Sequence, residues 1–329
     1  MDSGLKNPEL KLGFLYAGQG SQHPGMGADF YQENSVFREI FHRASFELDF
    51  DLKEVCFTDH QNLLNQTRYT QPCMVAFAVG LTEVLRERGI RPSVAAGLSL
   101  GEYSALYAAG VLDEQTVIRT VAFRGQAMER ASQGIESAMF AVFNLDRDSL
   151  ESVCQEVEAE GAGIVVISNY NCPGQLVIGG KKAAVKRAAE LAKEKGARRC
   201  LPLKVSGPFH TPLMAPAGKE LKEYFRDILF SELKIPVIFN CLGKSKPDDI
   251  TIPELLVRQV QSSIDIEGSI RTMAGMGLDA MIEIGPGKAL SGFVRKTVPE
   301  MPVYAIETVA DLEQLSDWLI ALEKKEKRS

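Results

Sequence analysis

The chain has 329 residues, of which 45% are hydrophobic, and its formal net charge is −6 at pH 7. It is long enough for one large domain with an insertion or for two domains, and its acidic balance argues against general nucleic-acid binding. No apolar run approaches the about 20 residues that span a bilayer, and the N-terminus lacks the pattern of an export signal, so we expect no membrane association.

The six cysteines are scattered along the chain, and none belongs to a C-x-x-C pair. This usage predicts neither a disulfide framework nor a zinc site, and it favours a reducing cytoplasm. A dinucleotide-binding loop at 18–27 is rejected, because His23 stands where the G-x-G-x-x-G pattern needs glycine. We therefore expect a cytoplasmic protein with no metal ion and no cofactor.

The first predicted elements are a strand and two helices. A buried strand is expected from Leu12 to Ala17, where it runs into a glycine-rich loop. Helical patterns follow at about 35–48 and 72–89. The second helix is expected to start just after Thr70, with Pro72 in its first turn, where proline is favoured.

Residues 97–101, Gly-Leu-Ser-Leu-Gly, fit the G-x-S-x-G pattern of a nucleophile on a sharp strand-to-helix turn. A buried strand is predicted before Ser99 and a helix after it, which is the context that this motif requires. The backbone N–H of Leu100 then becomes one donor of an oxyanion hole. Gln19 N–H, in the glycine-rich loop, is the candidate second donor, since glycines let a backbone approach a ligand closely.

A serine nucleophile needs a base, and the chain has four histidines. His210 is the best candidate, because its Gly/Pro-bounded loop lies at a predicted domain junction, where ligand sites gather. For His42 and His60 a packing or surface role is favoured over catalysis, and His23 is not excluded as the base. No Asp or Glu stands out as the partner of His210, so a backbone carbonyl or an amide side chain is the expected orienting group. This departs from a standard esterase triad.

The order of predicted strands and helices changes after Gly134. The segment 133–205 predicts the order β-α-β-β-α-β of a ferredoxin-like split unit, inserted into a larger α/β domain formed by 1–132 and 206–329. Helices are expected again at about 212–229, 252–275 and 288–297.

Two charged features have alternative interpretations. Arg124 lies in a largely apolar helical pattern, where it either forms an ordinary ion pair or binds a substrate carboxylate. The segment from Lys181 to Arg199 holds eight basic residues against two Glu. It is either a solvated helix face or a docking surface for an acidic partner.

Seven stretches in order resemble the malonyl-CoA:acyl carrier protein transacylases of fatty acid synthesis, over roughly 12–308. They are FLYAGQGSQHPGMG, AAGLSLGEYSALYAAGVL, FRGQAM, SNYNCPGQLVIGG, VSGPFHTPLM, LLVRQV and IEIGPGKALSGFVRK. The resemblance implies an α/β-hydrolase-like large domain with a ferredoxin-like small domain, and an S-malonyltransferase that forms a malonyl-serine intermediate in a ping-pong cycle. It implies malonyl-CoA and acyl carrier protein as partners.

Residue by residue, the resemblance implies Ser99 as nucleophile, His210 as base and Gln259 as the support of the histidine. Arg124 would hold the malonyl carboxylate, and Phe209 would exclude an α-methyl branch. Because carrier proteins of this kind are acidic, six basic residues become docking candidates: Lys181, Lys182, Lys186, Arg187, Arg295 and Lys296.

Two positions depart from the family pattern. Leu98 stands where histidine is usual, and Ala17 stands where proline is common. Three alternative functions remain: an acyltransferase in trans for a polyketide synthase, a hydrolase that clears stalled carriers, and a non-catalytic carrier-binding module. A monomer is expected, since no long apolar segment looks exposed.

Overall fold

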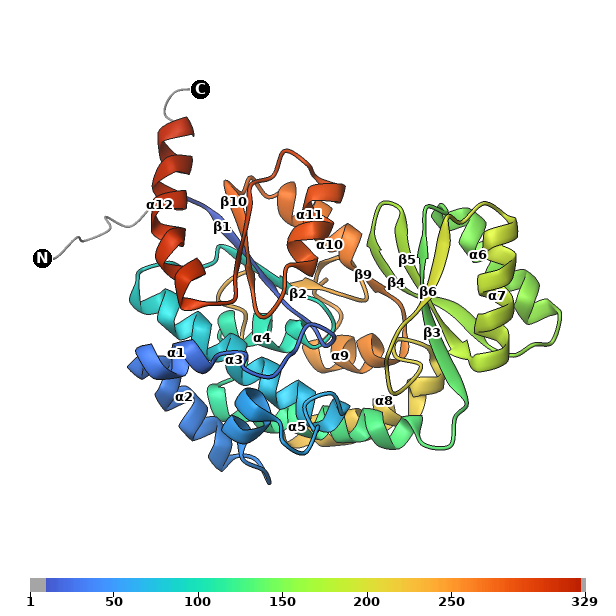
Figure 1. Cartoon of the computed structure of the whole chain (residues 1–329), viewed down its shortest axis with the longest axis horizontal. Helices are drawn as coiled ribbons and strands as arrows, with labels where there is room; N and C mark the ends of the chain where they lie inside the picture. The colour runs from blue at the N-terminus through green and yellow to red at the C-terminus, as the bar shows by residue number, and fades with distance from the viewer. Residues whose placement is uncertain (1–9, 327–329) are drawn as a thin grey trace, which may run out of the picture. The chain divides into compact units, whose positions relative to one another are not determined.

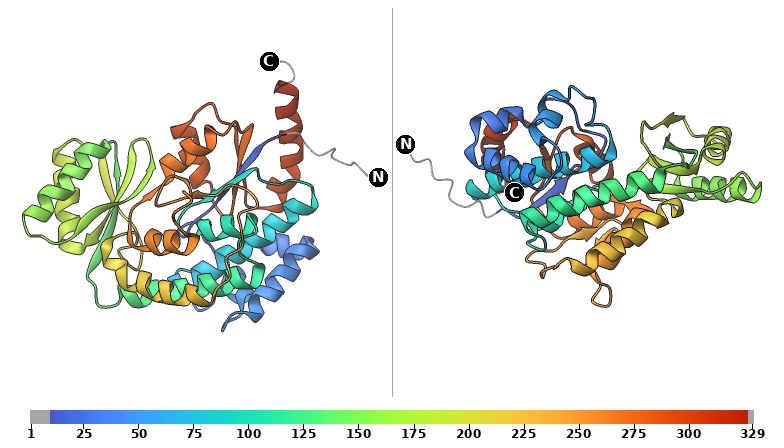
Figure 2. Two further views of the ribbon diagram at one scale, coloured as in Figure 1. Left: turned by 180° about the vertical axis from the view of Figure 1, so that it is seen from behind. Right: turned by 90° about the horizontal axis from the view of Figure 1, so that it is seen from below.

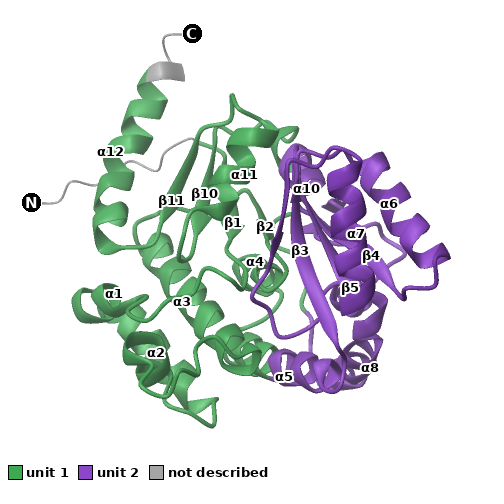
Figure 3. Ribbon diagram, turned by 45° about the vertical axis from the view of Figure 1, so that its right-hand side comes forward, with its two compact units in different colours: residues 1–122, 231–237, 273–329 green, residues 123–230, 238–272 purple. Residues whose placement is uncertain are grey.

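The computed structural model describes residues 10–326 (Figure 1). The chain forms two compact units, which are coloured separately in Figure 3. The first contains the residues up to Ala122, Ser231–Val237 and the residues from Met273 on. The second contains Phe123–Phe230 and Ile238–Thr272. The predicted insertion 133–205 falls within the second unit, and its borders stay a prediction.

The first unit is built around a parallel sheet of four strands in the order β11-β10-β1-β2 (Figure 3). Strands β1 (Leu12–Tyr16), β2 (Val94–Gly97) and β10 (Ala280–Ile284) are buried along their whole length. Strand β11 (Val303–Ile306) is half-buried at the sheet edge. Continuous burial fits a parallel sheet covered on both faces, and it explains why these strands are mostly apolar, with the buried Glu283 of β10 as an exception.

Several helices accompany this sheet. They are α1 (Ala28–Glu33), α2 (Ser35–Phe46), the π-helical η1 (Glu54–Thr58), α3 (Thr67–Glu87), α4 (Gly101–Ala108), α11 (Ala289–Thr297) and α12 (Val309–Glu326). Helix α4 packs on β1 and β2, and α11 and α12 pack on β11. Helix α5 (Glu114–Ser132) begins in the first unit and continues into the second from Phe123.

The second unit holds a sheet in the order β6-β3-β5-β4-β9. Its strands are β3 (Ser137–Phe143), β4 (Val165–Cys172), β5 (Gln175–Lys181), β6 (Arg199–Pro202) and β9 (Ile264–Asp265). The pairs β3·β5, β3·β6 and β4·β5 are antiparallel, whereas β9 adds to β4 in parallel. With the helices α6 (Arg147–Ala159) and α7 (Lys182–Glu194), the chain order is β-α-β-β-α-β, as predicted.

Both helices α6 and α7 lie on one face of this sheet (Figures 1 and 2). Asp146 caps α6, because its side chain accepts a hydrogen bond from Ser149 N–H at 2.9 Å. A hydrophobic cluster fills the space between helices and strands; it includes Leu150, Val153, Val157, Ile167, Ile178, Val185 and Ala188. Val165 and Ile167 of β4 and Leu176 and Ile178 of β5 belong to this cluster, so their side of the sheet is the one that the helices cover.

The rest of the second unit follows the small sheet along the chain. It contains η2 (Pro212–Met214), α8 (Ala215–Tyr224), η3 (Phe225–Asp227), β7 (Ile238–Phe239), β8 (Lys244–Ser245), α9 (Ile252–Gln261) and most of α10 (Ile266–Ala274). The last two residues of α10 belong to the first unit. Helix α9 begins with a capping box, in which Thr251 and Glu254 satisfy each other's backbone N–H groups.

Two predicted helix boundaries are wrong. The helix expected from residue 72 begins at Thr67, so Pro72 lies inside it; the burial of Thr67, Thr70 and Gln71 extends the helix beyond the sequence signal. The helix expected at 252–275 is two helices, because the chain is extended at Ser262 and then pairs with β4 through β9. Each half keeps an apolar face, which gave the appearance of one continuous helix.

Candidate functional site

Ser99 lies on a sharp turn between β2 and α4. Its φ is 51°, in the left-handed region that residues other than glycine rarely adopt. Leu98 N–H donates to Tyr16 O at 2.9 Å, and Gly101 N–H donates to Leu98 O at 2.9 Å, so backbone bonds hold both sides of the serine. The strained turn predicted from the G-x-S-x-G pattern is therefore present.

The two glycines of the motif are required by close backbone packing. A Cβ on Gly97 would lie 2.1 Å from the carbonyl carbon of Gly101, and a Cβ on Gly101 would lie 2.2 Å from Tyr16 O. Both distances are far below van der Waals contact. The turn can thus form only when both positions lack a side chain.

The glycine-rich loop after β1 packs against the serine turn. A Cβ on Gly18 would lie 2.4 Å from Leu98 O, so these two backbones are in direct contact. The side chain of Gln19 binds Thr67, since its Nε2 donates a hydrogen bond to the threonine hydroxyl at 3.1 Å. Leu100 is buried at the start of α4. The first unit therefore brings Ser99 and the loops of both predicted oxyanion donors together.

His210 is buried in the second unit, with a φ of 59°. Its Nδ1 lies 2.8 Å from Gln259 O. Because a carbonyl oxygen only accepts, Nδ1 carries the proton and Nε2 of the neutral ring keeps its lone pair. Burial lowers the pKa of His210 to about 4; the Gln259 bond raises this pKa and the charge of Arg124 lowers it. The ring is therefore neutral at pH 7.

Arg124 is fully buried in α5. Its Nη2 donates to Gln259 Oε1 at 2.9 Å, so the guanidinium has a neutral partner in the same glutamine that binds His210. Phe209, directly before the histidine, is 7% exposed. The second unit therefore brings together four predicted residues: Arg124, Phe209, His210 and Gln259.

The sequence left open which group of Gln259 contacts His210. A carbonyl or an amide was expected to orient the histidine, and the resemblance pointed to Gln259 without saying which of its groups would act. In the structure the backbone carbonyl binds His210 and the side chain binds Arg124. A backbone carbonyl has no side-chain signature, so no sequence signal distinguishes these two contacts. The hydrogen bond between Gln19 and Thr67 was not predicted either, because the two residues are 48 positions apart and neither signals the other.

The predicted docking residues differ in how much charge they leave exposed. Lys181, Lys182 and Lys186 are exposed along α7. Arg187 instead forms two hydrogen bonds of 3.0 Å with Glu160, which offset its charge. Arg295 and Lys296 are exposed near the end of α11 in the first unit.

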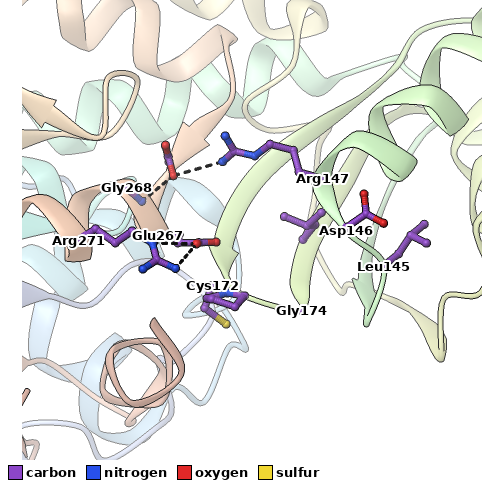
Figure 4. A pocket seen from close by; sticks show the side chains of 11 residues that line it. Leu145, Asp146, Arg147, Cys172, Gly174, Glu267, Gly268 and Arg271 are labelled. Carbon is purple, nitrogen blue, oxygen red and sulfur yellow. Dashed lines mark hydrogen bonds and ion pairs between the residues drawn. The ribbon is translucent and has the colours of Figure 1, made fainter. Parts of the chain in front are cut away.

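A pocket of about 480 Å³ lies in the second unit, and Figure 4 shows the side chains that line it. Its charged side chains pair with one another: Arg147 lies 3.7 Å from Asp265, and Arg271 lies 2.8 Å from Glu267. None of the predicted site residues lines it. The pocket therefore does not enlarge the candidate site.

Metal-binding clusters and membrane-spanning helices are both absent from residues 10–326. In this range no group of three or more His, Cys, Asp and Glu side chains is arranged to hold a metal ion. Within the same range, none of the helices combines the length and apolar character needed to cross a bilayer.

The first unit thus contains a strained serine turn, and the second contains a buried cluster of His210, Arg124 and Gln259. Residues 13–317 match the family described as acyl transferase domain, and the chain belongs to this family. The malonyl CoA-acyl carrier protein transacylase of Bacillus subtilis is 39% identical over 303 residues, which are 92% of this chain and 95% of the relative.

Solved structures agree with this assignment. The malonyl CoA-acyl carrier protein transacylase of Clostridium perfringens matches with a TM-score of 0.92 and 37% identity, covering 96% of this chain and 99% of that one. A malonyl-transacylase in complex with its type II PKS acyl-carrier protein matches with a TM-score of 0.89 and 37% identity, over 92% and 98% of the two chains.

Proposed function

We propose that this chain transfers the malonyl group of malonyl-CoA to the phosphopantetheine thiol of acyl carrier protein, and so supplies fatty acid synthesis. The strained Ser99 turn is the observation that carries the proposal, because a serine on such a strand-to-helix turn exposes its hydroxyl next to the N–H of the following residue. The family match and the names of the relatives support the same activity.

In the proposed first half-reaction, Ser99 Oγ attacks the thioester carbonyl of malonyl-CoA. The hydroxyl proton passes to Nε2 of His210, whose Nδ1–H stays bonded to Gln259 O. The oxyanion is held by the backbone N–H groups of Gln19 and Leu100. The C–S bond then breaks, and His210 returns the proton to the CoA sulfur. A malonyl-serine ester remains on the enzyme.

The proposed second half-reaction reverses these roles with another thiol. The phosphopantetheine thiol of the carrier protein gives its proton to His210, and its sulfur attacks the ester carbonyl. The C–O bond breaks, and Ser99 Oγ takes the proton back. The products are malonyl-carrier protein and free enzyme, so no cofactor or metal ion enters the balance.

Arg124 is the proposed binding group for the free malonyl carboxylate. A guanidinium forms two parallel hydrogen bonds to a carboxylate, and burial strengthens this interaction. Phe209 is the proposed selector against an α-methyl branch, because it is buried directly before His210. Both roles predict selection of malonyl over acetyl and methylmalonyl groups.

The proposal also includes the folds of the two domains, the cellular compartment, the oligomeric state and the docking residues. The small-sheet order β6-β3-β5-β4 supports a ferredoxin-like domain at 133–205, and the parallel sheet with a serine turn supports an α/β-hydrolase-like domain at 1–132 and 206–329. None of the six cysteines, which all lie in the described residues, forms a disulfide, and this supports a reducing cytoplasm. A monomer is proposed, with the exposed Lys181, Lys182, Lys186, Arg295 and Lys296 as docking candidates for an acidic carrier.

Intact-mass spectrometry tests the proposal directly. Wild-type protein mixed with malonyl-CoA is expected to gain one malonyl group, and Ser99→Ala is expected to gain none. The adduct is expected to disappear when phosphopantetheinylated carrier protein is added, with the malonyl group on the carrier. An unmodified wild-type protein would refute the activity and favour a carrier-binding module.

A polyketide carrier is the second candidate acceptor, since one matching structure is a complex with a type II PKS acyl-carrier protein. The same chase with a fatty acid carrier and a polyketide carrier distinguishes the two pathways by their transfer rates. Loss of the malonyl group in buffer alone, as fast as with either carrier, would instead indicate a hydrolase.

A further inference from the structure

His23 lies just beyond the loop of the proposed oxyanion donor Gln19, and it joins that loop to a distant part of the first unit. Its Nε2 lies 2.5 Å from Glu307 Oε1, and its Nδ1 lies 3.0 Å from Pro24 O. The other oxygen of Glu307 accepts Gly287 N–H at 3.0 Å. A chain of hydrogen bonds therefore connects residues 23–24 with the Gly285–Gly287 turn.

The geometry defines the protonation state of this histidine. Pro24 O only accepts hydrogen bonds, so Nδ1 carries a proton. An ionised Glu307 also only accepts, so Nε2 must carry the second proton. The arrangement is therefore that of an imidazolium between a carbonyl and a carboxylate. In agreement, the hydrogen bond to Glu307 raises the pKa of His23 above its ordinary value of 6.5.

The loop and the turn also touch through small residues. A Cβ on Gly285 would lie 2.6 Å from the Ala17 side chain, and a Cβ on Gly287 would lie 3.2 Å from that of Ser21. Ser21 Oγ donates to Gly18 O at 3.2 Å, inside the loop. Movement of the turn relative to the loop is thus transmitted to the backbone on either side of Gln19.

The inner side of the loop has separate supports. Gln19 Nε2 donates to Thr67, and Gln22 Nε2 donates to Asn65 Oδ1 at 2.9 Å. The outer end, by contrast, is held by the contact between His23 and Glu307, whose side chains are 50% and 21% exposed. An exposed ion pair is weak and responds to pH, so this end is the adjustable one.

We propose that His23 is a positioning residue for acyl transfer: its imidazolium, held by Glu307, aligns the loop that presents Gln19 N–H to the oxyanion. This inference rests on the proposed function. His23 does not touch the reacting atoms; it acts through the backbone of residues 18–23.

Other charged groups surround the Glu307 end of the contact. Asp311 Oδ2 accepts the backbone N–H groups of Glu307 and Thr308, at 3.2 and 2.9 Å, and Asp29 Oδ2 accepts that of Val309 at 2.8 Å. Lys288 acts electrostatically on Asp311. These carboxylates are occupied by backbone donors, so the group that titrates in the contact itself near neutral pH is His23.

The pH dependence has a definite sign. A histidine whose pKa is raised in the folded protein contributes its interaction fully below the ordinary pKa of 6.5, and the contribution is lost as pH rises through the raised value. The rate of Ser99 malonylation is therefore expected to decline about three- to tenfold on the alkaline side, as for the loss of a partly exposed ion pair.

The test is the single-turnover rate of malonyl-Ser99 formation, followed by intact mass from about pH 5 to about pH 8.5. His23→Gln keeps a side-chain N–H for Glu307 but does not titrate, so its alkaline decline is expected to disappear. Glu307→Gln is expected to move the decline to lower pH. His42→Gln is the matched control, because His42 binds only the Tyr31 hydroxyl among the contacts described, and it should keep the wild-type profile.

An NMR titration of the His23 ring gives a readout that does not depend on activity. The pKa of His23 is expected above 6.5 in the wild type and lower in Glu307→Gln. A His23→Gln variant that loses rate equally at every pH, or keeps the wild-type decline, would overturn the inference. A wild type that forms no malonyl-serine at any pH would instead overturn the proposed function.

Discussion

Nδ1 of His210 donates its proton to the backbone carbonyl of Gln259 at 2.8 Å. In a standard serine hydrolase triad, a carboxylate occupies this position and stabilises the imidazolium that forms during the reaction. A neutral carbonyl fixes the same tautomer and orientation, but it brings no full negative charge. The proposed base is therefore well oriented and weakly basic, which agrees with a pKa of about 4 caused by burial.

The first prediction concerns activity at low pH. Only neutral His210 accepts the Ser99 proton, and burial lowers the pKa of His210 to about 4. The malonylation rate is therefore expected to rise with pH through about 4 and to be constant near pH 5–6. Stopped reactions analysed by intact mass measure this profile. A midpoint near the ordinary histidine pKa of 6.5 would contradict the burial argument.

The same group predicts a stability change. Between about pH 6.5 and 4 the unfolded chain binds a proton at residue 210 that the folded chain excludes, so stability falls as pH is lowered through this range. The loss amounts to at most about 3 kcal/mol. Urea unfolding at several pH values measures it. His210→Gln does not titrate, and its stability should decline less with acid than that of the wild type.

Gln259→Ala separates the two contacts of Gln259. The backbone carbonyl that binds His210 remains, whereas the side chain that binds Arg124 is lost. We expect a raised KM for malonyl-CoA, with little change in the rate of acetyl transfer. Steady-state kinetics with both donors provide the measurement. Gln261→Ala, at the end of the same helix, is the control. A similar loss for both donors would show that the side chain supports the histidine.

The serine motif could be predicted from the sequence because its residue types lie within five positions of one another. Gly97, Ser99 and Gly101 specify a turn whose backbone leaves no room for side chains, and the strand and helix around it follow from hydrophobic pattern. The β-α-β-β-α-β order could also be predicted, since short apolar runs typical of strands take turns with helical patterns along this segment.

What the sequence did not reveal depends on distant partners. The earlier start of α3 follows from burial of Thr67, and the break between α9 and α10 follows from pairing of Ile264 with β4. The contact of His23 with Glu307 joins residues 284 positions apart. Neither residue type signals the other, so such contacts require the fold.

The glycine pair Gly101 and Gly292 tests the packing of the serine turn. A Cβ on Gly101 would lie 2.2 Å from Tyr16 O, whereas a Cβ on Gly292, inside α11, meets no atom within 4 Å. Gly101→Ala is therefore expected to lower the free energy of unfolding by about 1–3 kcal/mol or more. Gly292→Ala should be neutral or stabilising by up to about 1 kcal/mol, since alanine favours helices. Equal effects in urea unfolding would contradict this packing argument.

The last prediction concerns the choice of acyl group. Arg124 is buried and donates to the neutral side chain of Gln259, and in the proposed complex it binds the malonyl carboxylate. Removing one member of a buried, hydrogen-bonded charge pair costs about 2–5 kcal/mol, which is at least about 30-fold in kcat/KM. Arg124→Ala is therefore expected to lose malonyl transfer by at least this factor, while acetyl transfer, which needs no cation, is kept or increased. Arg130→Ala is the matched control, because Arg130 lies on the same helix and pairs with Glu220 at the surface. Competition between the two acyl-CoA donors, measured by intact mass, gives the ratio directly. Equal loss of both acyl groups would mean that Arg124 supports the fold of this region or the histidine, and that the carboxylate is bound elsewhere.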